Sequence, residues 1–254
     1  MRLLQLTFQD TRNSIGGYFK LLGYALLHAD ALRLRPVRTV FNRQVYFTAI
    51  QALKATALLA LMCGALVATQ ITALTGNNSE LVVSALGWTI VRELGPLITA
   101  IVIVARSSAA IASELALMRI HGEIQTLDFM GIPHGDYLLV PRIFGVALSV
   151  AALNIYFQMI AISGGLFVSS MFQHISFWEH INKFFSMISP LDFMLSLLKG
   201  LVYGAIIASS ACHHGMTITG AITDVPKATT SAVTHGILTI FLLDAVFAYT
   251  YLVI

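Results

Sequence analysis

The chain has 254 residues, of which 57% are hydrophobic and only 11% are charged, and its mean hydropathy is +0.81. Ordinary soluble domains carry about 25% charged residues, so this composition excludes a soluble globular class and predicts an integral membrane protein. The net charge of +3 does not indicate nucleic-acid binding, because seven of the fifteen Lys and Arg residues lie before residue 46, beside the first apolar run; that distribution favours a membrane surface.

Residues 1–45 form the first predicted element. The stretch IGGYFKLLGYALLHADALRLRPVR, residues 15–38, mixes Tyr, Phe and Leu with four basic residues. This mixture is expected of an amphipathic helix that lies in the membrane interface. A cytosolic tail with a few basic residues is the alternative.

Five later segments are apolar over the roughly 20 residues that a helix needs to cross a bilayer. If the N-terminus is cytoplasmic, the segments on that side hold ten Lys and Arg residues, and the other side holds only Arg92 and Lys183. The positive-inside rule therefore predicts an all-α, multi-pass protein with its N-terminus in the cytoplasm and its C-terminus outside. The predicted spans are 46–74, 94–117, 143–172, 193–212 and 229–254.

The polar insert 118–142 separates the second and third spans. Its apolar residues recur at helical spacing and its polar residues take other faces, which predicts an amphipathic helix of about three turns. Gly122 inside this helix is expected to cost roughly 1 kcal/mol relative to Ala, and Gly131 and Pro133 are expected to end it. A simple surface hairpin is the alternative, although a tight turn needs only a few residues. The apolar positions are Ile120, Ile124, Leu127 and Met130, and the polar ones are Glu123, Gln125 and Asp128.

Three stretches carry a family resemblance: RELGPLITAIVIVARSSAAIASELALMRI, TLDFMGIPHGDYLLVPR and GAITDVPKATTSAVTHGILTIFLLDAVF. They resemble the MlaE/YrbE permeases, the membrane subunits of ABC transporters that work with MCE-domain proteins. The resemblance runs from about residue 85 to the end and implies a permease domain over residues 46–254. It also implies a coupling helix at about 118–131 that docks into a groove on the ATPase through Ile120, Glu123, Ile124, Leu127, Asp128, Met130 and Gly131.

The same resemblance implies the partners. Two copies of the permease would surround a lipid cavity, with an ABC ATPase (MlaF-like) on the cytoplasmic side and an MCE-domain protein (MlaD-like) on the periplasmic side. A STAS-domain accessory protein (MlaB-like) is a further candidate partner. The cargo implied is phospholipid, moved between the inner and outer membranes from a location in the bacterial inner membrane.

The sequence shows no chemistry of its own for ATP. It contains no G-x-x-x-x-G-K-[ST] phosphate-binding loop, no H-E-x-x-H and no G-x-S-x-G. We therefore expect no enzymatic activity and no cofactor bound by this chain, with ATP and Mg²⁺ held by the partner ATPase. The adjacent His213 and His214 are interpreted as an interfacial pair and not as a metal site, and Cys63 and Cys212 as buried apolar residues.

Charges inside the spans are the best candidates for function, because each costs about 2.5–3.5 kcal/mol at the bilayer centre. At about 1.5 Å of rise per residue, Lys199 and Asp244 lie at matching depths on consecutive antiparallel helices. They are predicted to pair, and a structural role for the pair is favoured over a transport role.

The remaining charges are assigned to a substrate cavity or a gate. Lys54 and Arg106 fall very roughly 12 Å from the cytoplasmic face, and Glu114 falls close to that face. Arg106 has no obvious partner at its depth, so a polar cavity or a lipid headgroup and a structural pairing are equally open. Arg92 and Glu93, at the predicted outer mouth of the second span, either gate an exit or sit in the interface.

Other functions stay open at this point. A permease of the same architecture for a sterol or another hydrophobic lipid is the closest competitor. A stand-alone carrier or channel would more naturally show an inverted repeat or paired broken helices, and neither is found. Two stripes of small residues, one at Ala60, Gly64 and Ala68 and the other at Gly200 and Gly204, are predicted to pack helices together, within the chain or between subunits.

Overall fold

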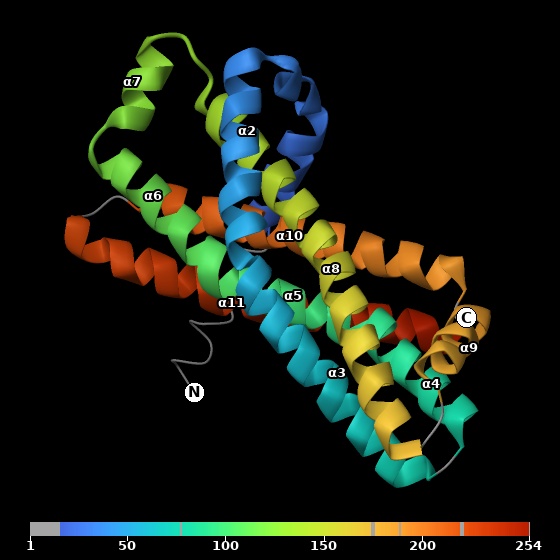
Figure 1. The fold of residues 1–254 in the computed structure, drawn as a ribbon. Helices are drawn as coiled ribbons and strands as arrows, with labels where there is room; N and C mark the ends of the chain where they lie inside the picture. The colour runs from blue at the N-terminus through green and yellow to red at the C-terminus, as the bar shows by residue number, and fades with distance from the viewer. Residues whose placement is uncertain (1–15, 77, 174–175, 188, 219–220, 254) are drawn as a thin grey trace.

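The computed structural model describes residues 16–76, 78–173, 176–187, 189–218 and 221–253. All regular elements within these ranges are helical, as the composition predicted (Figure 1). The first fifteen residues of the predicted N-terminal segment lie outside the described part of the chain.

Five helical stretches are long and apolar enough to cross a membrane, which confirms the predicted number of spans. The helix α3, for example, has 23 residues, so it is roughly 34 Å long and exceeds a hydrocarbon core of about 30 Å. The second stretch begins at Ser79, so the prediction of a start at residue 94 was wrong. The stretches are Arg35–Thr75, Ser79–Ile120, Gly135–Phe172, Pro190–Met216 and Ile222–Thr250.

The N-terminal residues pack against the bundle before the first span. Residues 16–27 are helical, the 3-10 turn η1 covers Ala29–Arg33, and α2 (Arg35–Thr48) follows with a proline in its first turn, where the missing N–H costs nothing. Tyr18 and Ala25 are buried. A second 3-10 turn, η2 (Ile50–Ala52), separates α2 from α3 (Leu53–Thr75).

The second stretch is not a regular α-helix. It consists of α4 (Ser79–Trp88), the π-helical segment η3 (Thr89–Leu94), α5 (Gly95–Ile103), a second π-helical segment η4 (Val104–Ser108) and α6 (Ala109–Ile120). Segments of this kind are rare and often occur at functional sites. Arg92 and Glu93 lie in η3, and Arg106 lies in η4.

The central helix is α8 (Val140–Gln173), which follows the π-helical segment η5 (Gly135–Leu139) and is the most buried of the five stretches. Both predicted stripes of small residues pack against it. A Cβ at Gly64 of α3 would collide with the backbone of Ala161, and one at Gly204 would lie 2.6 Å from the Cα of Ala147. Small residues thus allow close approach within the chain.

The insert between α6 and α8 differs from its prediction at one end. Gly122 has a φ of 75°, so it breaks the chain direction, and α7 begins only at Glu123 and ends at Phe129. The prediction of one helix through Gly122 was wrong. At the other end, Gly131 has a φ of 76°, and its N–H and that of Ile132 donate to Asp128 and Leu127. This is the Schellman geometry, so the helix ends where predicted.

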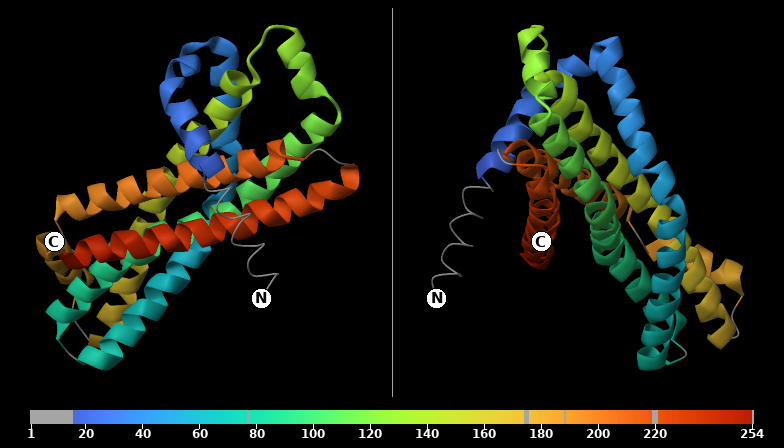
Figure 2. Two further views of the ribbon diagram at one scale, coloured as in Figure 1. Left: turned by 180° about the vertical axis from the view of Figure 1, so that it is seen from behind. Right: turned by 90° about the vertical axis from the view of Figure 1, so that its left-hand side faces the viewer.

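The remaining helices complete the bundle. The amphipathic α9 (Phe177–Met187) connects α8 to α10 (Pro190–Met216), and the turn η6 (Ile222–Asp224) leads into α11 (Val225–Val253). Seen from two further sides, α7 projects from one end of the molecule and α9 lies toward the other (Figure 2). We refer to these as the α7 end and the α9 end.

Candidate functional site

A group of charged and polar side chains from three different spans meets inside the bundle. Lys199 on α10 is 1% exposed, and its Nζ lies 3.4 Å from Glu93 Oε1 and 3.5 Å from Asp244 Oδ1. Tyr203, one turn further along α10, donates a hydrogen bond of 2.6 Å to the same oxygen of Asp244. We call these four residues, Glu93, Lys199, Tyr203 and Asp244, the Lys199 cluster. The structure thus brings the predicted pair of Lys199 and Asp244 together and adds two residues to it.

A proline explains part of this arrangement. In an α-helix the carbonyl of Arg92 would accept from the N–H four residues later, and that residue is Pro96, which has none. The carbonyl oxygen of Arg92 accepts a hydrogen bond of 2.9 Å from Lys199 Nζ. The irregular backbone of η3 therefore supplies a polar group that holds a buried ammonium.

Two further polar contacts lie beside the cluster. The guanidinium of Arg92 contacts Asp192 Oδ1 at 2.8 Å and lies over the ring of Trp88. Asn154 and Gln158 on α8 donate to Ser196 on α10, at 3.0 and 2.6 Å between side chains. Buried amides of this kind hold membrane helices together. They fix α10, and hence Lys199, relative to α8.

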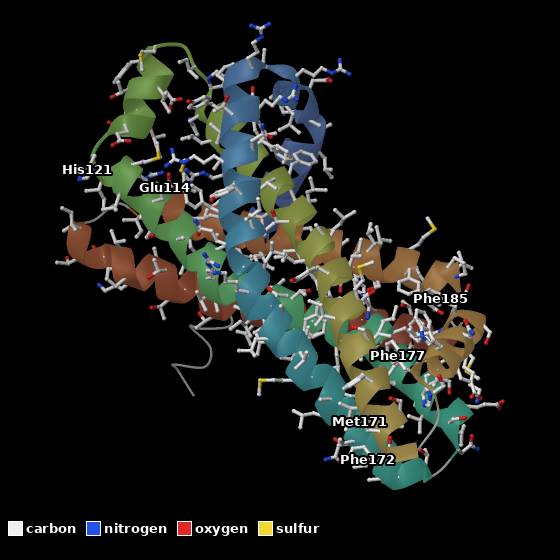
Figure 3. All side chains as sticks on the ribbon, viewed as in Figure 1. Glu114, His121, Met171, Phe172, Phe177 and Phe185 are labelled. Atoms are coloured by element: carbon white, nitrogen blue, oxygen red, sulfur yellow. The ribbon has the colours of Figure 1, made fainter. Side chains whose placement is uncertain are left out.

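The other predicted site residues lie toward the α7 end. Arg106 donates a hydrogen bond of 2.6 Å to the neutral amide of Gln51, a partner that the sequence did not indicate. Glu114 forms an ion pair of 3.1 Å with Arg142, which is buried. Lys54 is exposed on α3, one turn after Gln51. Figure 3 shows Glu114 and His121 near the α7 end, far from Met171, Phe172, Phe177 and Phe185.

The residues predicted for coupling divide between two surfaces of α7. Ile124 is buried and Leu127 half-buried against the core. Met130 is instead 61% exposed, next to Phe129, which is 90% exposed, and to Ile132. We call Phe129, Met130 and Ile132 the α7 tip.

The remaining coupling candidates lie at both ends of α7. Asp128 Oδ1 lies 2.7 Å from His134 Nδ1, and this hydrogen bond holds the pKa of the Asp128 carboxyl below its ordinary value of 3.8. Glu123 is exposed in the first turn of α7, and Ile120 is half-buried at the end of α6. A side-chain hydrogen bond therefore connects the loop after α7 to the end of the helix, beside the tip.

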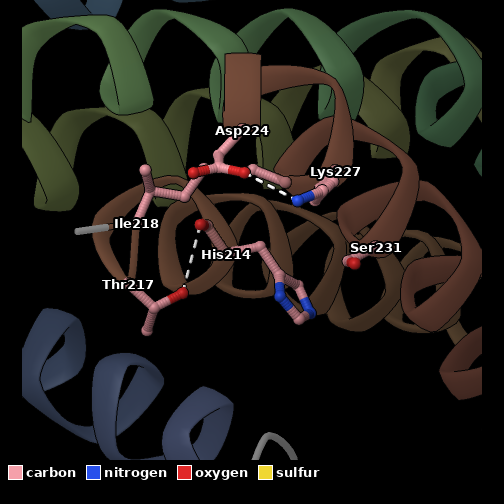
Figure 4. A pocket seen from close by; sticks show the side chains of 7 residues that line it. His214, Thr217, Ile218, Asp224, Lys227 and Ser231 are labelled. Carbon is pink, nitrogen blue, oxygen red and sulfur yellow. Dashed lines mark hydrogen bonds and ion pairs between the residues drawn. The ribbon is translucent and has the colours of Figure 1, made fainter. Parts of the chain in front are cut away.

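A hollow between α10 and α11 also lies in this half of the molecule (Figure 4). Lys227 and Asp224, which line it, form an ion pair of 2.8 Å. His214 lies 2.8 Å from the hydroxyl of Tyr18 and stacks on His235. Among the described residues, no group of three or more His, Cys, Asp or Glu side chains is placed to hold a metal.

Sequence reasoning missed several of these residues. Arg142 and Asp192 flank spans, where charged residues are common, so nothing marked them as partners. Gln51, Asn154 and Gln158 are uncharged and were not considered, although amides in apolar runs are themselves a signal. Phe129 lies off the apolar face that the helical spacing predicted, so its exposure was not expected.

The chain is similar to known membrane permeases. The family model described as "Permease MlaE" matches residues 41–250. A protein of Synechocystis sp. named "Probable ABC transporter permease protein" is 34% identical over 62% of this chain and 60% of its own length. The Arabidopsis thaliana protein "TRIGALACTOSYLDIACYLGLYCEROL 1, chloroplastic" is 32% identical over 61% of this chain and 44% of its own length. A Rickettsia prowazekii protein, also named a probable ABC transporter permease, is 28% identical over 76% of each chain. The first two matches thus span less than two thirds of those relatives.

Proposed function

The chain belongs to the MlaE family of ABC transporter permeases, and from this membership we propose that it moves phospholipids between the inner and outer membranes of a bacterium, driven by a separate ATPase. In this proposal the chain supplies the path for the lipid. ATP and Mg²⁺ bind to the partner ATPase, and this chain catalyses no reaction.

The observation that carries the proposal is the α7 tip. Exposed large apolar groups in a cluster indicate an interaction surface, and this one is held in place by the Schellman bonds and the Asp128–His134 contact. Phe129 is 90% exposed, so burial in a groove of the ATPase would remove nearly its whole side chain from water. That burial would contribute about 1.5–3 kcal/mol to the complex.

Copurification of the ATPase tests this step. The tagged chain, produced together with the ATPase of the same transporter, is compared with the variants Phe129→Asp and Leu74→Asp. Leu74 is a matched control, because it is 85% exposed and lies at the end of α3, away from α7. We expect Phe129→Asp to lose most of the bound ATPase and Leu74→Asp to keep it. Equal retention of the ATPase by both variants would contradict the docking role of the α7 tip.

Two considerations support a lipid cargo. One relative carries in its name a glycerolipid, trigalactosyldiacylglycerol. In addition, five spans of one chain enclose little space, and ABC ATPases act as pairs, so two copies of the permease would form the lipid cavity between them. An MCE-domain protein outside the inner membrane would exchange lipid with this cavity, and a STAS-domain protein is a candidate regulator of the ATPase.

A transfer assay tests the cargo. The complex of permease, ATPase and MCE-domain protein is reconstituted in vesicles that contain labelled phosphatidylglycerol or labelled cholesterol, and ATP-dependent transfer to acceptor vesicles is measured. We expect transfer of the phospholipid only. Transfer of cholesterol without phosphatidylglycerol would support the competing reading, a permease for a sterol.

The orientation is also part of the proposal. The excess of Lys and Arg in residues 1–45, 118–142 and 213–228 favours a cytoplasmic N-terminus and α7 end. Docking of a cytoplasmic ATPase at α7 requires the same orientation.

A further inference from the structure

A polar cavity of about 510 Å³ lies between α2, α6 and the start of α8, apart from the Lys199 cluster. Three arginines and one carboxylate line it. They are Arg43 on α2, Arg106 in η4, Arg142 on α8 and Glu114 on α6. We call this the arginine cavity.

The positive charge of the arginine cavity is not balanced by the described residues. Glu114 pairs with Arg142. The described partners of the other two guanidinium groups are neutral, because Arg106 donates to Gln51 and Arg43 lies over the ring of Phe47. The three arginines and one glutamate sum to a formal charge of +2. Uncompensated guanidinium groups in a membrane protein are costly, and they usually mark a binding site or a polar path.

Arg142 provides an independent indication of a missing acceptor. The side chain is 4% exposed, and its Nη1 is buried with no hydrogen-bond partner in the described part of the chain. A buried donor that stays unsatisfied destabilises the fold. An anion that entered the cavity beside Arg142 would bring an acceptor to this guanidinium.

The cavity wall also suggests the class of ligand. Apolar side chains, among them Phe47, Ile111, Met118 and Leu138, line the cavity together with the arginines. An arginine fork matches the oxygens of a phosphate, whereas the apolar wall matches a chain or glycerol backbone attached to it. We propose that the arginine cavity binds a phosphate group, as found in a phospholipid headgroup or in free phosphate, through Arg43, Arg106 and Arg142.

This site goes beyond the proposed function, because it is separate from the docking surface on α7 and from the Lys199 cluster. It requires only that the chain lies in a bilayer that contains phospholipid. The arginine cavity would bind its ligand whichever lipid the transporter moves. Binding to the isolated permease and ATP-driven transfer by the complex are therefore separate measurements, and either can fail alone.

The test is lipid binding to the purified full chain in detergent, measured by native mass spectrometry. The ligands are phosphatidylglycerol and diacylglycerol, which has the same acyl chains but no phosphate. Inorganic phosphate is added as a competitor. The variant Arg43→Gln/Arg106→Gln removes the two uncompensated charges and leaves the Arg142–Glu114 pair intact. The control Arg35→Gln/Arg38→Gln removes two exposed charges on α2, the helix of Arg43, that do not line the cavity.

We expect the Kd of phosphatidylglycerol to rise about ten-fold or more in the cavity variant, since charged hydrogen bonds are lost, and to stay within about two-fold in the control. Diacylglycerol binding should not change. If inorganic phosphate at millimolar concentration displaces phosphatidylglycerol, the cavity is a phosphate-binding site whose ligand is free phosphate and not the lipid headgroup. If the double variant fails to fold, Arg106→Gln alone provides the comparison.

Two results would overturn the proposal. One is that the cavity variant binds phosphatidylglycerol within about two-fold of the wild type, since the lost charged hydrogen bonds would then contribute nothing. The other is that diacylglycerol binding falls as much as phosphatidylglycerol binding, which would show that the phosphate is not what the arginines recognise.

Discussion

Lys199 and Asp244 lie 45 residues apart on consecutive helices, and their charged atoms are 3.5 Å from each other although Lys199 is 1% exposed. Glu93 lies at 3.4 Å from the same ammonium. We predict that Lys199→Met destabilises the protein by at most about 3–5 kcal/mol, because the mostly buried carboxylate of Asp244 and the partly exposed one of Glu93 then lose their cation. Thermal unfolding of the purified protein in detergent measures the effect.

Lys54→Met is the control for this prediction. Lys54 is exposed, so the same substitution there should change stability by no more than about 0.5 kcal/mol. If both variants unfold at the temperature of the wild type, the Lys199 cluster does not stabilise the bundle.

Two glycines at the contact of α3 and α8 provide a matched pair of substitutions. A Cβ at Gly64 would collide with the backbone of Ala161, whereas one at Gly164 would lie 3.7 Å from Leu61, at ordinary contact distance. We predict that Gly64→Ala destabilises by about 1–3 kcal/mol through overpacking. Gly164→Ala should be neutral or slightly stabilising, since Ala favours a helix. Thermal unfolding measures the stability of both variants. If Gly164→Ala were the less stable of the two, the close approach of α3 and α8 at Gly64 would be refuted.

The turn between α6 and α7 gives a third prediction. Gly122 has a φ of 75° and nothing within 4 Å of the position of a Cβ, so its replacement meets backbone strain and no steric clash. Gly122→Ala should cost about 1–2 kcal/mol, and Gly122→Asn less, because Asn tolerates the left-handed region. Hydrogen exchange of residues 118–131 measures the local effect. Equal protection in both variants would show that the turn does not constrain α7.

A fourth prediction concerns alkaline pH. Burial, together with the hydrogen bond to Asp136, raises the pKa of Tyr24 from 10.0 to about 12. Because the folded pKa is higher than the unfolded one, this contribution is fully present below pH 10 and is lost as the pH rises toward 12. Unfolding temperatures measured between about pH 9 and about pH 12 should fall more for the wild type than for Tyr24→Phe. Parallel pH profiles would contradict the contact.

The gross architecture could be predicted from the sequence because apolar length determines how many helices cross a bilayer. The matching depths of Lys199 and Asp244 in the membrane were also predictable, since the rise per residue of a helix is constant. The two side chains do meet in the structure. Glu93 was not assigned to them, because the second span was expected to begin just after it. The π-helical segments were not predictable either, since one extra residue in a turn hardly disturbs the apolar pattern.

The break at Gly122 was missed for a related reason. Ile120 and Ile124 are four residues apart, so the helical spacing continues across the break although the chain does not. The least predictable feature was which side chains contact one another. Gln51 and Arg142 lie far from Arg106 and Glu114 in sequence, and only the folded structure brings η2 beside η4 and the start of α8 beside α6.

The most direct test of the central claim is native mass spectrometry of the gently solubilised, tagged chain produced together with the ATPase and MCE-domain protein of its transporter. We predict a species with two permease copies, an ATPase dimer and bound phospholipid, and loss of the ATPase from the Phe129→Asp variant. A stable species that contains only this chain, with no ATPase retained, would contradict the claim that the protein works as the membrane subunit of a phospholipid transporter.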